Sequence, residues 1–115
     1  GSDIFLMPSR FEPCGLGQMI AMRYGAVPVV RRTGGLADTV PEVNTDLSEG
    51  RGFVFNEYDT NAMLAALDRA LTVYYKRDVW DRLIRRIMSA DFSWRASVMK
   101  YEAVYKKALE ARRHA

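Results

Sequence analysis

The sequence predicts an α/β fold with about three parallel strands, flanking helices and a helical C-terminal half. Three short apolar runs occupy residues 4–7, 27–30 and 52–55, and none of them alternates apolar with polar residues. Such runs are typical of strands covered on both faces, as in a parallel sheet. Helical patterns separate the runs, and strand–helix–strand units of this kind give parallel strands with right-handed crossovers.

Glycine and proline mark the two helices between the strands. Residues 15–24 predict a helix that Gly25 closes, because glycine readily adopts the left-handed conformation that ends a helix. Residues 34–39 predict a shorter helix that ends near Pro41. The polar stretch 44–51 then predicts a loop before the third strand.

Three further helices are expected in the second half of the chain. Asp59 or Thr60, Asp78 and Ser93 are the residues expected to cap them. Apolar residues recur at helical spacing after each cap, which predicts one packing face per helix. In the last helix this stripe consists of Trp94, Val98, Tyr101, Tyr105, Ala108 and Leu109. We expect core packing rather than sugar stacking for Trp80, Trp94, Tyr101 and Tyr105, although the last stripe could require a partner outside this chain.

Composition limits the classes of function. The 115 residues suffice for one small domain, and the net charge of +3 is too mild and too terminal for a nucleic-acid-binding face. No apolar run approaches the length of a membrane span. With Cys14 as the only cysteine and His114 as the only histidine, we expect no disulfide, zinc site, Cys–His dyad or cofactor.

The turn after the first strand is the first candidate site. Ligands of open α/β sheets bind at the carboxyl ends of strands, and Glu12 stands there in a Pro- and Gly-rich turn. Its carboxylate could accept hydrogen bonds from sugar hydroxyls or stabilise developing positive charge. Two structural alternatives remain: Ser9 and Glu12 as a capping box, or Glu12 as a solvated loop residue. For Cys14 the alternative is a small buried apolar residue.

The turn after the second strand is the second candidate site. Residues 31–36 read Arg-Arg-Thr-Gly-Gly-Leu, and they again lead from a strand into a helix. Free amides at a helix start favour a phosphate, and Arg31 or Arg32 could add positive charge. An ordinary strand–helix turn is the alternative. Adjacent parallel strands would present one turn to a sugar and the next to a phosphate, as a nucleotide sugar requires.

Several stretches resemble the C-terminal region of the bacterial glycogen synthase and plant starch synthase family. They are residues 7–16 (MPSRFEPCGL), Gln18, 22–25 (MRYG), 28–40 (PVVRRTGGLADTV) and 91–94 (DFSW), followed by Tyr101 and Tyr105. The resemblance spans nearly the whole chain, and the run SRFEPCGL is highly specific. In other glycosyltransferases of the same fold, a second acidic residue usually stands where this sequence has Gln18 or a neighbour.

The resemblance implies a GT-B architecture of two Rossmann-like domains, with residues 1–115 as a single fragment forming the C-terminal half of the nucleotide-sugar-binding domain. It implies a retaining glucosyltransferase that moves glucose from ADP-glucose or UDP-glucose to the nonreducing end of an α-1,4-glucan. Glu12 would be catalytic at the donor sugar. The residues implied to bind the substrate are Cys14, Gly15 and Leu16 at the sugar, and Thr33, Gly34 and Gly35 at the distal phosphate.

The family's basic pair at the diphosphate, its acceptor site and a histidine at the catalytic centre would all lie outside these residues. We therefore expect negligible glucosyl transfer by the chain alone. The alternatives are a module that binds a nucleotide sugar or glucan without turnover, and a structural half-domain that dimerises through its first strand or last helix. The resemblance leaves the bacterial cytoplasm and the plastid open as locations, and it implies no nucleic-acid or membrane partner.

Overall fold

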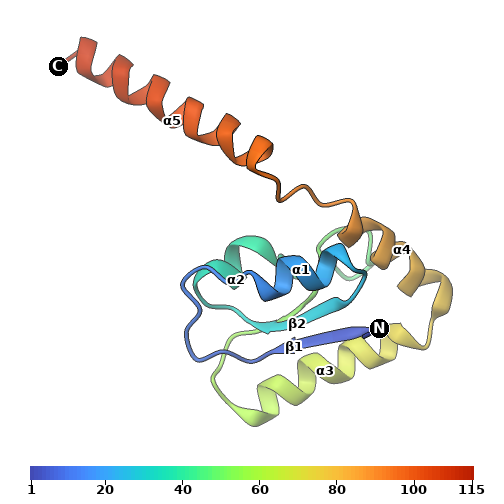
Figure 1. The fold of residues 1–115 in the computed structure, drawn as a ribbon. Coiled ribbons are helices and arrows are strands. Elements are labelled where there is room, and N and C mark those ends of the chain that lie inside the picture. The colour runs from blue at the N-terminus through green and yellow to red at the C-terminus, as the bar shows by residue number, and fades with distance from the viewer.

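A computed structural model describes residues 1–115 as a three-stranded parallel sheet with helices on both faces (Figure 1). The strands β1 (Ile4–Met7), β2 (Val27–Arg31) and β3 (Phe53–Phe55) lie side by side in that order. Ile4 pairs with Val27, and the β3 pairing begins at Val29. The predicted α/β class, the three strands and their parallel direction are confirmed.

Five helices surround or follow the sheet. The first two, α1 (Gly17–Arg23) and α2 (Gly34–Thr39), cover one face, and α3 (Thr60–Tyr74) covers the other (Figure 1). They are followed by α4 (Arg77–Met88), which contacts α1 and α3, and by α5 (Trp94–Arg113). The predicted α2 has the bounds that the structure shows.

Two predicted helix starts require correction. The first helix begins at Gly17 rather than residue 15, because Gly15 has a φ of +69°, a left-handed conformation that a right-handed helix excludes. Asp78 does not cap α4 but lies in its first turn, since Lys76 occupies the cap position. There the carboxylate still faces the positive end of the helix dipole.

Asp59 and Ser93 cap their helices as predicted. The Asp59 carboxylate accepts hydrogen bonds from the amides of Asn61 and Ala62, at 3.0 and 3.2 Å. The Ser93 hydroxyl oxygen accepts one from the Ala96 amide, at 3.3 Å. Each cap satisfies amides that the helix leaves unpaired and is worth about 1 kcal/mol.

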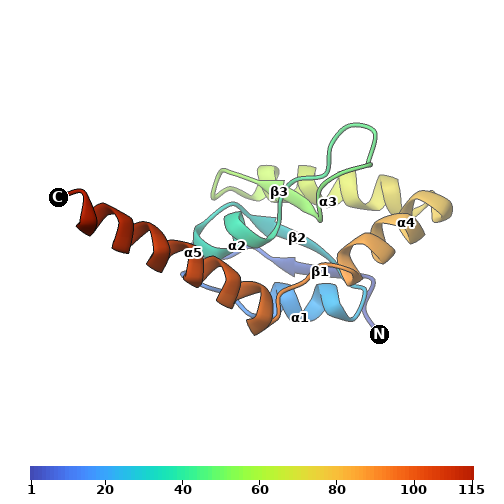
Figure 2. The same ribbon diagram turned by 90° about the horizontal axis from the view of Figure 1, so that it is seen from above.

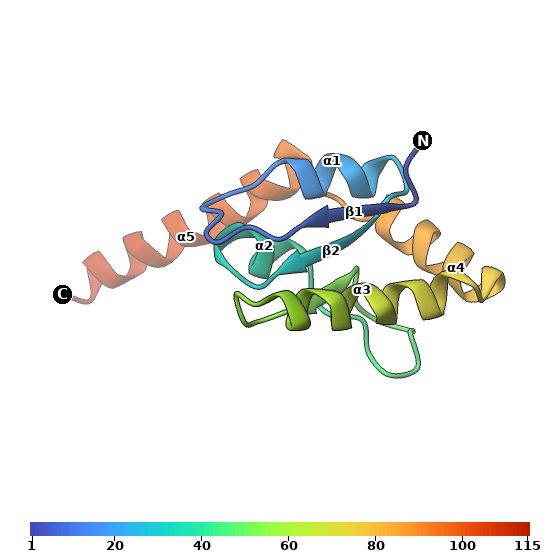
Figure 3. The same ribbon diagram turned by 90° about the horizontal axis from the view of Figure 1, so that it is seen from below.

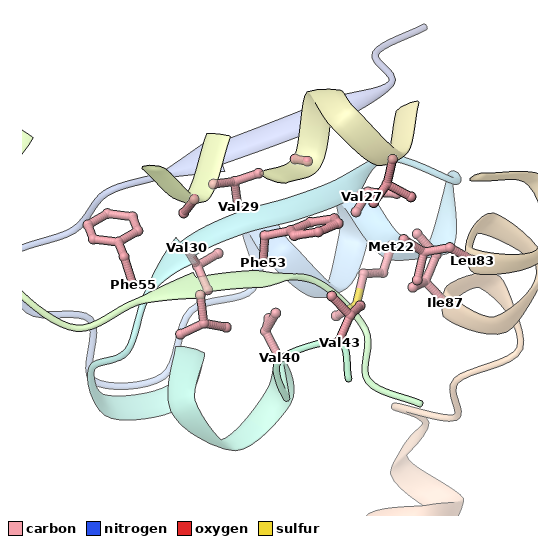
Figure 4. Packing of buried hydrophobic residues seen from close by; sticks show 14 of the residues in the cluster. Met22, Val27, Val29, Val30, Val40, Val43, Phe53, Phe55, Leu83 and Ile87 are labelled. Atoms are coloured by element: carbon pink, nitrogen blue, oxygen red, sulfur yellow. The ribbon is translucent and has the colours of Figure 1, made fainter. Parts of the chain in front are cut away.

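The core lies around β2, the central strand. Val27, Val29 and Val30 are fully buried, which matches the continuous apolar run in the sequence. Figure 4 shows Phe53 from β3 and Met22 from α1 packed around this strand, and Leu83 and Ile87 from α4 close the core at one end. Trp80 is fully buried as well, so the core expectation for that residue is confirmed.

The first strand is less covered than its sequence predicts. All four residues of β1 retain some exposure, and the Leu6 side chain is 41% exposed. The reason is position, because β1 forms one edge of the sheet and has a neighbouring strand only on the β2 side. An edge strand of apolar residues is open to pairing with another strand.

The other edge of the sheet is closed by two side chains. The Glu42 carboxylate accepts a short hydrogen bond from the Val54 amide of β3. The Arg69 guanidinium donates to the Val54 carbonyl at 2.9 Å and forms an ion pair with Glu42 at 3.1 Å. The pair therefore takes the place of a neighbouring strand at the middle of β3.

The last helix stands apart from the rest of the molecule. Helix α5 packs against no other helix or strand, and Figures 1 and 2 show it projecting away from the sheet. None of its residues is buried, and Trp94, Tyr101 and Tyr105 are 82%, 59% and 67% exposed. The expectation that these aromatics pack in the core is therefore wrong for this chain. No helix is both long and apolar enough to span a membrane.

Candidate functional site

The two predicted turns lie in direct contact. Both follow strands that run in the same direction, so they emerge at the same end of the sheet (Figure 3). The Gly35 amide at the start of α2 donates a hydrogen bond of 2.9 Å to the Glu12 carbonyl. The structure thus brings Glu12 and Cys14 beside Gly34 and Gly35, as expected for turns on adjacent parallel strands.

The close approach of the turns explains the two glycines of the second turn. Gly34 has a φ of +46°, in the left-handed region that favours glycine. A Cβ atom on Gly34 would collide with the Glu12 carbonyl, and one on Gly35 would collide with the Cys14 carbonyl. Only glycine at both positions lets the backbone of α2 approach the turn after β1.

The buried side chain of Gln18, in α1, joins the same two turns. Gln18 Nε2 donates to the Gly15 carbonyl at 2.8 Å and to Thr39 Oγ1 at 3.0 Å. The Thr39 hydroxyl in turn donates to the Gly35 carbonyl at 2.8 Å. Gln18 is fully buried, and its Oε1 atom has no hydrogen-bond donor. In the sequence, Gln18 stands among apolar residues of a short helix, which is a signal of a specific polar role that the motifs alone did not reveal.

Several backbone amides in the turns are free. The N–H groups of Cys14, Gly15, Leu16 and Thr33 donate to no acceptor within the protein. Gly15 is buried and Thr33 is half-buried, and amides without partners are uncommon at such positions because each unmade hydrogen bond is costly. Cys14 and Leu16 are exposed, so their amides are open to solvent or to a ligand. Free donors in the turns that follow β1 and β2 are suited to a ligand rich in oxygen acceptors.

Glu12 is held by its backbone while its side chain is unpaired. The residue is half-buried, and its carboxylate makes no hydrogen bond or ion pair within the chain. No helix begins at Ser9 or Glu12, which excludes the capping box. Cys14 is an exposed free thiol, so the buried alternative for that residue is wrong. The carboxylate is therefore available to a ligand at the turns.

The candidate site formed by the turns after β1 and β2, called the half-site below, is open rather than enclosed. A hollow of about 660 Å³ runs between α1 and the connection from α4 to α5, and its lining includes Leu16 but not Glu12. No group of three or more His, Cys, Asp or Glu side chains lies close enough together to hold a metal ion. The chain presents an open surface at this site, made of the Glu12 carboxylate, free amides and the N-terminal end of α2.

Comparison with known proteins finds similar sequences among the glycogen synthases. No family model matches the chain. The glycogen synthase of Syntrophotalea carbinolica is 58% identical over 110 residues, which cover 96% of this chain and 23% of that protein. The glycogen synthase of Moorella thermoacetica is 58% identical over 116 residues, which cover all of this chain and 24% of that protein. This chain is homologous to the glycogen synthases. It spans about a quarter of the length of these curated relatives.

Solved structures agree with the family's architecture. The catalytic domain of starch synthase IV from Arabidopsis thaliana, bound to ADP and acarbose, superposes with a TM-score of 0.82 at 45% identity, covering 95% of this chain and 23% of that one. A sucrose-phosphate synthase from Thermosynechococcus elongatus superposes with a TM-score of 0.65 at 26% identity, covering 95% of this chain and 26% of that one. The fold is therefore that of the C-terminal domain of GT-B glycosyltransferases, as the resemblance implied.

Proposed function

We propose that this chain is part of a retaining glucosyltransferase that moves glucose from a nucleotide sugar to the nonreducing end of an α-1,4-glucan, and that it supplies one wall of the donor site. The observation that carries the proposal is the contact between the two turns, through the 2.9 Å hydrogen bond from Gly35 to Glu12. That contact sets a carboxylate beside free amides at the end of a parallel sheet, where ligands of such sheets bind.

Each turn has a chemical role in this proposal. The Glu12 carboxylate accepts hydrogen bonds from the donor sugar and stabilises the positive charge that develops at its reacting carbon. The free amides of Cys14, Gly15 and Leu16 donate to sugar oxygens. Thr33 and the start of α2 hold the distal phosphate, where Gly34 and Gly35 allow close backbone approach. ADP-glucose and UDP-glucose both fit these roles, and they require no cofactor.

The chain alone is expected to be inactive. It spans about a quarter of the length of its relatives. The acceptor site and the basic side chains that balance the charge of the diphosphate therefore belong to the remainder of the protein. With one wall of a cleft, the reacting groups are not brought into line, and most of the rate gain from positioning is lost. The bacterial cytoplasm and the plastid are the expected locations of the whole enzyme.

The test is an amide NMR titration of the ¹⁵N-labelled chain with ADP-glucose, UDP-glucose and ADP. We expect saturable shifts at residues 14–16 and 33–35. The Glu12→Gln variant should bind ADP as the unmodified chain does and bind ADP-glucose more weakly, because only the sugar contacts Glu12. Glu57→Gln, on an exposed loop, is the matched control. Unchanged spectra at millimolar ligand would contradict a preformed donor half-site.

The whole enzyme provides a second test. In the full-length synthase that contains this chain, Glu12→Gln should lower the rate of glucan elongation roughly 100- to 1,000-fold, the usual effect of removing one group that stabilises transition-state charge. The melting temperature should not fall, because the Glu12 carboxylate has no partner within the chain. A variant with normal turnover would remove Glu12 from the proposed mechanism.

A structural half-domain that associates with another chain is the second candidate. The open edge of β1 and the uncovered apolar face of α5 favour it. Light scattering of the chain at increasing concentration separates the two proposals. A dimer that binds no nucleotide sugar would favour the structural role, whereas a monomer at high concentration would count against it.

A further inference from the structure

Arg31 links the loops that follow all three strands. It is the last residue of β2 and is half-buried. Its Nη1 atom donates to the Arg10 carbonyl at 2.7 Å, and its Nε atom donates to the Asn56 carbonyl at 3.0 Å. The guanidinium carbon also lies 5.5 Å from the centre of the Tyr58 ring, within the range of a cation–π contact. No carboxylate pairs with it.

These contacts hold the loop that carries Glu12. Arg10 lies two residues before Glu12, and the Glu12 carbonyl accepts the hydrogen bond from Gly35. The loop is therefore attached at two points to the segment that runs from the end of β2 into α2. Hydrogen bonds from a charged donor are about twice as strong as neutral ones, and the planar guanidinium fixes the directions of both of its bonds.

The geometry points to Arg31 as a positioning residue for Glu12 rather than as a ligand of the phosphate. We propose that its guanidinium sets the backbone of residues 10–12 so that the Glu12 carboxylate stands at the correct distance from the donor sugar. The inference rests on the proposed glucosyltransferase function. It also gives Arg31 a different role from its neighbour Arg32, which donates no side-chain hydrogen bond within the chain.

The test compares variants of the full-length synthase that contains this chain. Arg31→Gln should lower kcat about 10- to 100-fold, because a misplacement near 1 Å costs up to about that factor. The affinity for ADP should stay unchanged, whereas the sugar nucleotide should bind more weakly, as in the Glu12→Gln variant, because only the sugar contacts Glu12. Arg31→Lys should recover part of the rate, since one ammonium can reach one of the two carbonyls. Arg77→Gln is the matched control, because the Arg77 guanidinium also lies over a tyrosine ring, 5.1 Å from its centre, and holds no backbone carbonyl.

Hydrogen exchange measured by mass spectrometry gives a readout that does not depend on activity. The Gly35 amide donates to the Glu12 carbonyl, so the peptide that contains Gly35 should exchange faster in the Arg31→Gln synthase and at the unmodified rate in Arg77→Gln. Weaker ADP binding with normal kcat would overturn the inference by making Arg31 a phosphate ligand. Unchanged kcat and unchanged exchange would overturn it as well. An unmodified synthase that transfers no glucose would instead contradict the proposed function, and the exchange experiment would still decide whether Arg31 holds the loop.

Discussion

The Gln18 side chain makes the hydrogen bonds that join the turn after β1 to the helix that follows the turn after β2. Its amide nitrogen reaches the Gly15 carbonyl and the Thr39 hydroxyl, and Thr39 passes the connection on to Gly35. Gly15 must remain glycine beside it, because a Cβ atom there would lie 2.7 Å from Gln18 Oε1 and the backbone is left-handed. Together with the hydrogen bond from Gly35 to Glu12, this buried side chain fixes how the turns after β1 and β2 sit relative to each other.

Replacing Gln18 by leucine should destabilise the chain. Leucine has a similar size but donates no hydrogen bond, so the Gly15 carbonyl and the Thr39 hydroxyl lose their shared donor. The expected loss in the free energy of unfolding is about 1–3 kcal/mol, measured by urea denaturation. Ile20→Ala on the exposed face of the same helix should change it by less than about 0.5 kcal/mol. Equal stability of the Gln18 variant and the unmodified chain would contradict the network.

The hydrogen bonds of Asp46 predict that the stability of the loop before β3 depends on pH. A hydrogen bond of 2.6 Å from the Ser48 hydroxyl, helped by the Ser48 amide at 3.0 Å, lowers the pKa of this carboxyl from its ordinary value of 3.8. A lowered pKa in the folded state gives stabilisation that is present above pH 3.8 and is lost as the pH falls through the lowered pKa.

The Ser48 amide resonance should therefore titrate below pH 3.8 in an NMR pH series. In the Asp46→Asn variant this step should disappear, because the amide side chain does not ionise. A midpoint for Asp46 above its ordinary value would show that these hydrogen bonds do not form in solution.

At the scale of elements, the two edges of the sheet differ. On β3 the Glu42–Arg69 pair satisfies the amide and the carbonyl of Val54, so a further strand cannot pair there without displacing both side chains. On β1 no side chain plays this part, and the strand is apolar and partly exposed. The sheet can therefore be extended on the β1 side only, and a further strand would pair there.

The Glu42→Ala variant tests whether the Glu42–Arg69 pair protects the β3 edge of the sheet. Removing the carboxylate leaves the Val54 amide without an acceptor and Arg69 without its ion pair, for a loss of about 1–3 kcal/mol in the free energy of unfolding. The Val54 amide should also exchange faster with solvent, as NMR hydrogen exchange can measure. Glu102→Ala, on the exposed α5, is the matched control. Slow exchange of Val54 in the Glu42 variant would show that another group protects the edge.

For the whole molecule, α5 is separable from the α/β body. It buries no residue and contacts no other element, so it adds nothing to the core. A chain that ends at Ser93 should unfold at the same urea concentration as the complete chain, within about 0.5 kcal/mol in the free energy of unfolding. A larger loss would mean that α5 packs on the body in solution.

Much of the fold was readable from local patterns. The strands follow from apolar runs without alternation, and the long helices follow from caps and periodic apolar faces, because these signals reflect short-range backbone and burial preferences. The two errors in helix starts arose where a single residue departs from its pattern. Gly15 delays α1 through its left-handed backbone, and Lys76 rather than Asp78 precedes α4.

By itself the sequence determined the α/β class, the parallel order of elements and the two turns that carry the candidate site. These features depend on composition and spacing along a short stretch of chain. Only the tertiary structure decided that Gln18 and Arg31 hold the turns in place, that β1 forms an open edge and that the stripe of α5 is uncovered. Each of these depends on which residues distant in the sequence come into contact, and a local pattern carries no information about those contacts.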